Sequence, residues 1–443
     1  MRGWSVGVGS VCMTRTYDIV GTVAATTQRT LDRVVVVGGS LAGLRACETL
    51  RSSGYTGTIA LVSAEDCRPY DRPPLSKQLL AGAWEADRIS LRRDDAFDAL
   101  GLDEHFGVPA AGVDLDARSI VLADGDELPY DGLIIATGAH PRRLPGQPDA
   151  PHIHELRTLD DALRLRDAIG RDDAQVVVIG AGFIGLEVAA TARRAGATVT
   201  VLEGAPAPLI RGAGAELGAA LAAIHPAEGV DIRCGVAVDG IEAGGVRLAD
   251  GSLVAATAVV VGIGVVPATG WLDGSGLDLR DGVVTAPTLS TRAPGVFAAG
   301  DLVRWVNPRF EEEMRVEHWT NAAEQGALAA RNLLAESAGG ELVAYDAVPF
   351  VWSDQYRHRI QFLGRSTAAH GTPAEPLIVV GSPVEHQFLA VYTSAGRLRG
   401  VLGLNVPRLV MKYRPLLERQ ARLGDALALA AEQRAALPTA SAG

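Results

Sequence analysis

Apolar positions along this chain gather in short continuous runs that alternate with glycine-containing turns and helix-like stretches. One such run, Val176–Ile179, leads through a glycine cluster and a helical pattern into a second run, Thr198–Leu202. Continuous runs of β-branched residues are typical of strands that are buried on both faces of a parallel sheet. The pattern therefore predicts a strand, a glycine turn, a helix and a second strand.

The predicted turn carries the spacing G-x-G-x-x-G at Gly180, Gly182 and Gly185. The first glycine permits the tight turn, the second lets the backbone approach a pyrophosphate, and the third lets the helix pack closely on the strand. The pyrophosphate would then lie at the helix N-terminus. Glu203 ends the second strand, where a carboxylate binds a ribose 2′-hydroxyl and repels a 2′-phosphate. We predict an NADH site rather than an NADPH site.

The same construction occurs earlier in the chain. Val34–Val37 leads into a glycine turn with Gly38 and Gly43, and Thr58–Val62 is the expected return strand. Two complete fingerprints with identical helix spacing imply two dinucleotides in one chain. Ser40 stands where the middle glycine belongs, so its side chain narrows the approach of a pyrophosphate while its hydroxyl offers a hydrogen bond.

A second internal repeat lies downstream of each fingerprint. Leu122–Gly125 recurs as Leu248–Gly251, and each copy predicts a hairpin turn on Asp-Gly that is followed by an apolar strand. The strands end in glycine loops, which place these residues at the two nucleotide sites: Thr137, Gly138, Gly262 and Gly264. The two nucleotide-binding domains are therefore expected to be built alike.

Other candidate ligand-binding residues follow strands of the first domain. Glu65 lies where an acid for the first ribose is expected. Arg68–Lys77 is proline-rich and is expected to cross the carboxyl edge of the sheet as a stiff loop, with Lys77 in a short helix over Leu75–Leu80. Without further context, Lys77 would be interpreted as an ordinary solvated side chain. Asp301 follows the strand Val296–Ala299 and could accept hydrogen bonds from a polyol, with a turn aspartate as the alternative.

The remaining pattern predicts several helices and a third domain. Tyr345 onward alternates apolar and polar residues, which indicates an antiparallel sheet that is followed by helices after Pro407. The strands of this sheet are expected around Ile360–Leu363, Leu377–Val380 and Phe388–Tyr392. Helices are expected before the third domain over Thr158–Ala168, Ala215–Ala223 and 317–335. His225 is expected to be an ordinary residue at a helix end.

Composition narrows the possible functions. A chain of 443 residues with 48% hydrophobic content can form two or three domains. The net charge of −11 argues against a general nucleic-acid binder. The cysteines are scattered without metal-ligand spacing, which favours a reduced cytoplasmic protein without a metal site: Cys12, Cys47, Cys67 and Cys234.

Two segments could be mistaken for targeting or membrane elements. Residues 1–32 have no continuous apolar core, so we expect a disordered extension rather than a signal peptide, and Met13 is an alternative start. Ser252–Leu272 is uncharged, but glycines and a proline interrupt it. Its valine run predicts a buried strand.

Six motifs, in this order from Arg33 to about Leu423, carry a resemblance to a known family. They are the duplicated fingerprints, RPYDRPPLSK, ATG, AAGD, RVEHWTNAAEQG and PFVWSDQY. The chain resembles the FAD-dependent NADH:ferredoxin reductases that serve cytochrome P450 and Rieske oxygenase systems. The resemblance implies an α/β fold of glutathione-reductase type, with two Rossmann-like dinucleotide-binding domains plus a C-terminal α+β domain. The expected boundaries are 33–141 and 271–344 for the FAD domain, 142–270 for the NAD domain, 345–430 for the C-terminal domain and 431–443 for a tail.

The resemblance also implies roles for residues around a non-covalently bound FAD. The Gly38 turn would hold the pyrophosphate, Asp301 the ribityl chain, and Arg157 would reach FAD, with Arg72 among the cofactor-binding residues. Trp319 would lie near the polar edge of the flavin.

Further roles concern the two faces of the flavin. Trp352 would cover the ring on the side that faces the ferredoxin, and Phe183 occupies the place where relatives often have tyrosine over the flavin. Glu187 would lie in the nicotinamide pocket and pair with Lys77, which lies by the flavin. These last two residues are the expected catalytic pair, because pairing across a dry pocket avoids two uncompensated charges.

The implied partner is an iron–sulfur ferredoxin, with a 2Fe–2S cluster as the expected type. NADH gives up a hydride while such a protein accepts one electron at a time, so the chain needs a flavin that can do both. Ferredoxins are typically acidic, and Val391–Leu423 contains a single acid, Glu418, and seven basic residues: Arg397, Arg399, Arg408, Lys412, Arg414, Arg419 and Arg422. This segment is a candidate docking face, with a solvated helix surface as the equal alternative.

Two rival readings stay open. Cys67 lies roughly where single-cysteine NADH oxidases and coenzyme A disulfide reductases carry a redox thiol, although those lack the following RPPLSK pattern. The other rival is a flavoprotein binding module that resembles apoptosis-inducing factor, for which slow NADH oxidation and a long-lived charge-transfer complex would be the signature.

Overall fold

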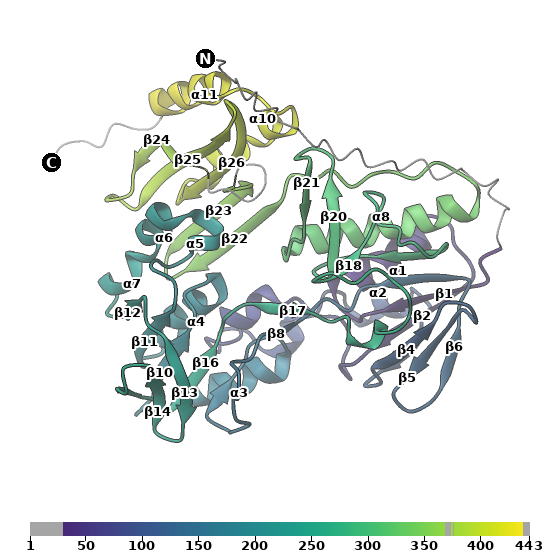
Figure 1. Cartoon of the computed structure of the whole chain (residues 1–443), viewed down its shortest axis with the longest axis horizontal. Coiled ribbons are helices and arrows are strands. Elements are labelled where there is room, and N and C mark those ends of the chain that lie inside the picture. Colours follow the sequence, from purple (N-terminus) through teal and green to yellow (C-terminus); the bar gives the residue numbers. More distant parts are fainter. Residues whose placement is uncertain (1–29, 368–373, 375, 437–443) are drawn as a thin grey trace, which may run out of the picture.

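The computed structural model describes residues 30–367, 374 and 376–436. The extension expected over residues 1–32 therefore lies almost wholly outside the described residues, and so do the alternative start at Met13 and the end of the expected tail. Figure 1 shows two α/β units, with a C-terminal sheet and its helices above them.

The first unit is a parallel five-stranded sheet in the order β19-β7-β1-β2-β3. Four strands come from the beginning of the described chain: β1 (Arg33–Val37), β2 (Thr58–Ser63), β3 (Asp103–Phe106) and β7 (Gly132–Ile135). The fifth, β19 (Val296–Ala298), arrives from far downstream and pairs with β7. The sheet is therefore completed by a distant segment of the chain.

Helix α8 (Trp319–Ser337) fastens that downstream segment to α1 (Leu41–Ser52). A Cβ atom on Gly326 would lie 2.1 Å from the carbonyl oxygen of Ala42, so the two helices meet backbone to backbone. Only glycine permits this approach, which packs the first turn of α1 directly against α8.

The second unit is a parallel sheet in the order β12-β11-β10-β16-β9. Its central strand β10 (Gln175–Ile179) is buried on both faces, as the continuous apolar run predicts. The other strands are β9 (Ile153–His154), β11 (Thr198–Glu203), β12 (Asp231–Cys234) and β16 (Ala258–Val261). Because β16 is a buried strand, the prediction for Ser252–Leu272 is confirmed. Within the described residues, no helix is long and apolar enough to span a membrane.

Each unit carries the predicted hairpin. The Gly125 N–H donates to the Leu122 carbonyl at 3.0 Å, and the Gly251 N–H donates to the Leu248 carbonyl at 2.9 Å. The first hairpin sheet contains β4 (Ala110–Asp114), β5 (Ser119–Leu122) and β6 (Glu127–Pro129); the second contains β13 (Val238–Glu242), β14 (Gly245–Leu248) and β15 (Leu253–Ala255). The units are joined where β8 (Ala139–Pro141) pairs with β17 (Val265–Pro267).

The C-terminal part is an antiparallel sheet in the order β22-β23-β26-β25-β24, as the alternation predicts. Its strands are β22 (Phe350–Gln355), β23 (His358–Gly364), β24 (Pro376–Ser382), β25 (Gln387–Ser394) and β26 (Arg397–Leu404). Three helices follow: α9 (Pro407–Met411), α10 (Arg414–Glu418) and α11 (Leu423–Ala436), yellow in Figure 1. We expected a tail from residue 431, and α11 instead continues to Ala436.

The prediction of a short helix over Leu75–Leu80 is wrong. The chain forms a 3-10 helix, η1 (Pro73–Ser76), and then isolated turns such as the Ala81 N–H to Lys77 carbonyl bond at 2.8 Å. The backbone leaves the helical region at Lys77, where φ is −125° and ψ is −99°, so the turn of η1 is not continued as a regular α-helix.

The predicted helices 215–223, 158–168 and 317–335 are confirmed within two residues at either end. The first is α6 (Ala215–Ala222), and α3 (Leu159–Ile169) begins at a capping box between Thr158 and Asp161. The other elements are α2 (Asp94–Asp98), α4 (Phe183–Arg194), α5 (Ile210–Ala213), α7 (Ile224–Ala227), η2 (Ala86–Ile89), η3 (Gly270–Leu272), β18 (Val283–Val284), β20 (Val303–Asn307) and β21 (Glu312–Met314).

Candidate functional site

A single cavity of about 1580 Å³ touches both α/β units and β22 of the C-terminal sheet. A pocket for one small ligand typically occupies roughly 300–1,000 Å³, so this space is large enough for two bound molecules. Every predicted site residue except Gly43 lines the cavity. The sequence repeats are therefore brought to one place.

The two glycine turns both line the cavity and have the same backbone geometry. A Cβ on Gly38 would lie 2.1 Å from the Ala136 carbonyl oxygen, and one on Gly180 would lie 2.4 Å from that of Gly262. Both glycines have positive φ, at +127° and +104°. Each turn therefore requires glycine and leads directly into a helix N-terminus, which suits a pyrophosphate.

The third glycine of each fingerprint lies beneath its turn. A Cβ on Gly43 would come within 2.0 Å of the Gly38 carbonyl oxygen, and one on Gly185 within 2.2 Å of the Gly180 carbonyl oxygen. Gly43 is thus a packing residue that shapes the wall without lining it. A Cβ on Gly182 would meet nothing within 4 Å, so this backbone is open to a ligand.

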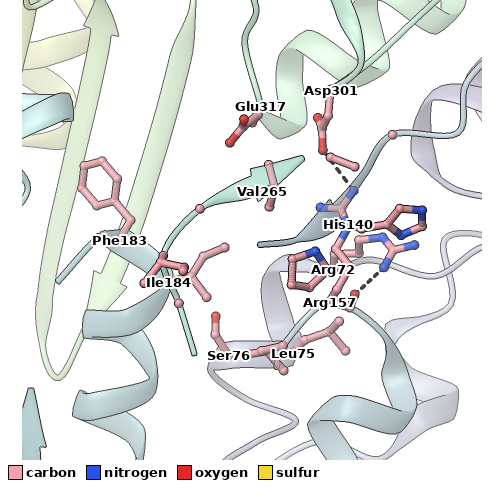
Figure 2. Close-up of a pocket in the computed structure, with 18 of the residues that line it drawn as sticks. Arg72, Leu75, Ser76, His140, Arg157, Phe183, Ile184, Val265, Asp301 and Glu317 are labelled. Carbon is pink, nitrogen blue, oxygen red and sulfur yellow. Dashed lines mark hydrogen bonds and ion pairs between the residues drawn. The ribbon is translucent and has the colours of Figure 1, made fainter. Parts of the chain in front are cut away.

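Arg72 organises the first turn. Its Nη2 lies 2.7 Å from Glu65 Oε1, its Nε donates to Ser40 Oγ at 3.2 Å, and its Nη1 donates to the Arg157 carbonyl. Arg157 in turn pairs with Asp301 at 3.0 Å (Figure 2). Ser40, which replaces the middle glycine of the pattern, therefore fits the site because its hydroxyl accepts a hydrogen bond within this polar network.

The second turn has fewer side chains around it. Glu203 accepts the Ala181 N–H at 2.7 Å and the Ala205 N–H at 2.8 Å, so it stabilises the turn from the end of β11. An ionised carboxylate has about four acceptor positions, which leaves capacity for a ribose hydroxyl.

The ring of Phe183 lies against Gly212, where a Cβ would be 3.1 Å from Phe183 Cε2. Figure 2 shows this ring across the cavity from His140, with Ile184 nearer to Ser76. The stacking role expected for Phe183 therefore stays a prediction.

A buried ion pair lines the same cavity as the two turns. Lys77 Nζ is 2.6 Å from Glu187 Oε2, and the two side chains are only 13% and 6% exposed. Glu187 also accepts from Ser76 Oγ at 2.5 Å and from Ser353 Oγ at 2.6 Å. Loop, helix α4 and strand β22 therefore meet at one carboxylate, which accepts hydrogen bonds from three donors, as a buried charge requires.

Sequence reasoning missed Asp71. Its Oδ1 accepts the Trp319 indole N–H at 2.6 Å, and the Trp319 and Trp352 rings meet edge to face at 6.1 Å between centroids. Burial raises the pKa of Asp71, an effect that the Trp319 hydrogen bond and nearby Lys77 oppose. The acid inside the proline-rich motif was the available signal, because that loop was already expected to cross the ligand edge.

His318, at the start of α8, is a half-buried side chain on the cavity wall, and its Nδ1 atom is buried. Burial lowers the pKa of His318 to about 4, although Asp301 opposes this shift. Its Nδ1 finds no hydrogen-bond partner within the described residues. An orphaned polar atom of this kind fits a site whose ligand completes the hydrogen bonding.

Cys67 does not line the cavity. Burial and then the charges of Glu65, Asp66 and Asp160 raise the pKa of its thiol. Since the thiolate is the reactive form, this environment is the opposite of what a redox cysteine needs.

Comparison with known proteins agrees with this architecture. The model of the pyridine nucleotide-disulphide oxidoreductases matches residues 32–326, and the reductase C-terminal model matches residues 350–437. Rhodocoxin reductase of Rhodococcus erythropolis is 36% identical over 392 residues, which cover 87% of this chain and 89% of the relative. The chain belongs to the ferredoxin reductase family.

Two further relatives support the placement of this family member. The ferredoxin–NAD(+) reductase component of the p-cumate 2,3-dioxygenase system of Pseudomonas putida is 38% identical, covering 77% of this chain and 83% of the relative. The crystal structure of the covalent putidaredoxin reductase–putidaredoxin complex contains a chain with a TM-score of 0.83 and 32% identity, covering 92% and 99% of the two chains. The chain is thus an NAD(H)-dependent oxidoreductase of this family, and membership implies binding of FAD and NAD(H).

Proposed function

We propose that this reductase oxidises NADH and passes the electrons through non-covalently bound FAD, one at a time, to a 2Fe–2S ferredoxin. The ferredoxin would supply a cytochrome P450 or a Rieske oxygenase. The observation that carries the proposal is that both glycine turns and the Lys77–Glu187 ion pair line one cavity. When bound, FAD supplies the ability to accept a hydride and to release single electrons.

The residues present fit this pair of ligands. FAD would be held at the Gly38 turn by the network of Arg72, Arg157 and Asp301, with His318 at the cavity wall. The nicotinamide nucleotide would be held at the Gly180 turn. In balance, one NADH and two oxidised ferredoxins give NAD⁺, two reduced ferredoxins and one proton.

The chain's own task is to orient and to exclude water. Lys77 and Glu187 neutralise each other in a pocket where an isolated charge would be costly, and they fix the side chains that face the nicotinamide. Glu203 holds the second turn and disfavours a 2′-phosphate, which supports NADH as the donor. Hydride transfer needs no general base, and none is proposed.

The expected docking face changes in one respect. Arg399 is not free for an acidic partner, because it pairs with Glu312 at 2.8 Å and is only 13% exposed. Arg408 on α9 and Lys412 just after it are exposed on the C-terminal domain. These two residues are the docking cations that we propose.

Charge reversal tests both the partner and its surface. We expect Arg408→Glu with Lys412→Glu to raise the ferredoxin KM about tenfold, with a salt-dependent rate, and to leave NADH–ferricyanide activity unchanged. Cytochrome c reduction through a panel of 2Fe–2S ferredoxins from both oxygenase classes measures the effect. Arg171→Glu is the control, because that residue is 65% exposed in the NAD domain and far from α9 in sequence. Equal loss in both assays contradicts the docking face, and a protein that binds no flavin contradicts the function.

The Cys67 rival loses support, since the thiol is kept protonated outside the cavity. We expect Cys67→Ser to keep full turnover.

A further inference from the structure

A row of buried polar side chains leads away from Glu187 into the C-terminal domain. Ser353 Oγ lies 2.6 Å from Glu187 Oε1, and Gln355 Nε2 lies 3.1 Å from Ser353 Oγ. His225 Nε2 lies 2.9 Å from Gln355 Oε1, and Tyr356 Oη lies 3.3 Å from His225 Nδ1. Ser353, Gln355 and His225 are at most 1% exposed. The row therefore runs from the nicotinamide pocket to a half-buried tyrosine at the β22–β23 turn.

The chemistry of each group fixes the direction of every hydrogen bond in this row. An ionised carboxylate only accepts, so the Ser353 hydroxyl must donate to Glu187. That hydroxyl has one proton, so it must accept from the Gln355 NH₂ group, which turns the Gln355 oxygen towards His225. His225 must then donate from Nε2. Its other nitrogen, Nδ1, accepts from Tyr356.

The state of His225 and Tyr356 agrees with these directions. Burial lowers the pKa of His225, which keeps the imidazole neutral with one donor and one acceptor nitrogen. Burial also raises the pKa of Tyr356, which keeps its phenol proton available for donation. All hydrogen bonds in the row thus point towards Glu187, and hydrogen bonds aligned in one direction strengthen one another in a buried setting.

The row connects three parts of the chain at one carboxylate. Glu187 and His225 belong to the second α/β unit, Ser353 and Gln355 share one face of β22, and Lys77 comes from the loop of the first unit. A second tie supports the same junction, because Thr191, one turn after Glu187, donates to the Ser76 carbonyl at 2.8 Å.

We propose that Ser353, Gln355 and His225 are positioning residues, which hold the Glu187 carboxylate and thereby the Lys77 ammonium in the geometry used for hydride transfer. The reference to hydride transfer rests on the proposed function, whereas the positioning of Lys77 can be tested without it. Hydrogen bonds to a charged acceptor are the strong ones, so loss of one donor should let the pair sample other arrangements.

The sequence offers a direct probe of Lys77. Lys77 and Lys412 are the only lysines in the chain, so the holoenzyme labelled with ¹³Cε-lysine has two lysine signals. Lys412 is exposed on the C-terminal surface and serves as the internal reference. The informative variants are Ser353→Ala and Gln355→Leu, the second of which interrupts the row without touching the carboxylate.

Gln433→Leu is the matched control. Gln433 is also a glutamine of the C-terminal domain, 2% exposed and hydrogen-bonded to Tyr413 Oη and the Leu409 carbonyl, but it belongs to no contact with Glu187. Gln433→Leu also removes a buried amide, so it should lower stability by a similar amount. It should leave the Lys77–Glu187 ion pair unchanged.

We expect the Lys77 signal to move or broaden in Ser353→Ala and Gln355→Leu, with Lys412 unchanged, and to stay in place in Gln433→Leu. Flavin bleaching by NADH should slow about tenfold in the first two variants at saturating NADH, a kcat effect rather than a KM effect. An unmoved Lys77 signal in both variants, or an equal change in Gln433→Leu, overturns the proposal. If the signal responds but no ferredoxin is ever reduced, the positioning role stands and the proposed function fails.

Discussion

The two dinucleotide turns follow one backbone plan and differ in what surrounds them. Around Gly38, Arg72 links Glu65, Ser40 and the Arg157 carbonyl into a side-chain network that continues to Asp301. Around Gly180, Glu203 accepts hydrogen bonds from two backbone N–H groups, those of Ala181 and Ala205, and Gly182 is open. We infer that the first turn suits a dinucleotide that stays through many turnovers, and the second suits one that must leave after each.

This difference indicates that the glycine fingerprint determines where a pyrophosphate binds but does not determine how long the ligand stays bound. Retention depends on side chains from other elements, such as Asp301, which follows β19 and pairs with Arg157 in the network of the first turn. A site for a cosubstrate needs fewer side-chain contacts, because each additional contact also slows release of the product.

Glycine replacements give the largest expected effect. Gly43→Ala places a Cβ 2.0 Å from the Gly38 carbonyl oxygen, and Gly185→Ala places one 2.2 Å from that of Gly180. We expect Gly43→Ala to yield colourless protein, and Gly185→Ala to stay yellow but resist bleaching by NADH. Absorbance before and after NADH and then dithionite measures both. Gly240→Ala, where a Cβ meets nothing within 4 Å, is the control. Loss of flavin from both variants would show that the two turns are not independent.

Acid should weaken the flavin side through His318. Its pKa is lowered to about 4 in the folded chain from an ordinary 6.5, so the unfolded chain binds more protons between these values. Stability therefore decreases as pH falls from 6.5 to 4, by at most about 3 kcal/mol from this half-buried residue.

Urea unfolding at a series of pH values measures the His318 effect, and His318→Asn should flatten that part of the curve. The contribution of Glu317 to the pH dependence of stability must be subtracted. Burial raises the pKa of Glu317, so its contribution has the opposite sign. Comparing wild type with the variant removes this term. Parallel curves for the two proteins would refute the role of His318.

The smallest expected effect concerns coenzyme choice. Glu203→Gln keeps a hydrogen-bond acceptor for the Ala181 N–H but removes the charge that repels a 2′-phosphate. We expect the ratio of kcat/KM for NADH over NADPH to fall about tenfold, which is about 1.4 kcal/mol. The same change at Glu65, in the flavin turn, should leave that ratio unaltered. A shift with Glu65→Gln instead would reverse the assignment of the two turns.

Local patterns in the sequence predicted most of the fold. The repeated glycine turns, the Asp-Gly hairpins and the alternating C-terminal strands each depend on residues close together in the chain, and all appear in the structure. The helix expected over Leu75–Leu80 did not form because the backbone leaves the helical region at Lys77, the residue that pairs with Glu187 from a distant part of the chain.

What escaped prediction depends on contacts between distant segments. His225 was expected to be an ordinary helix-end residue, and it does lie in α7, but it bonds to Gln355, 130 residues away. Asp71 meets Trp319 across 248 residues, and Arg399 is withdrawn from the surface by Glu312. No periodicity or spacing in a single sequence encodes such pairs.

The meeting of α1 and α8 at Gly326 has a consequence for biogenesis. The ribosome makes the Gly38 turn first, then the whole second α/β unit, and only afterwards the strand and helix that close the first one. During synthesis the second unit can reach its final form while the first unit still lacks an edge strand. Under the proposed function, we therefore expect flavin loading to be a late event that requires β19 and α8 to have been made.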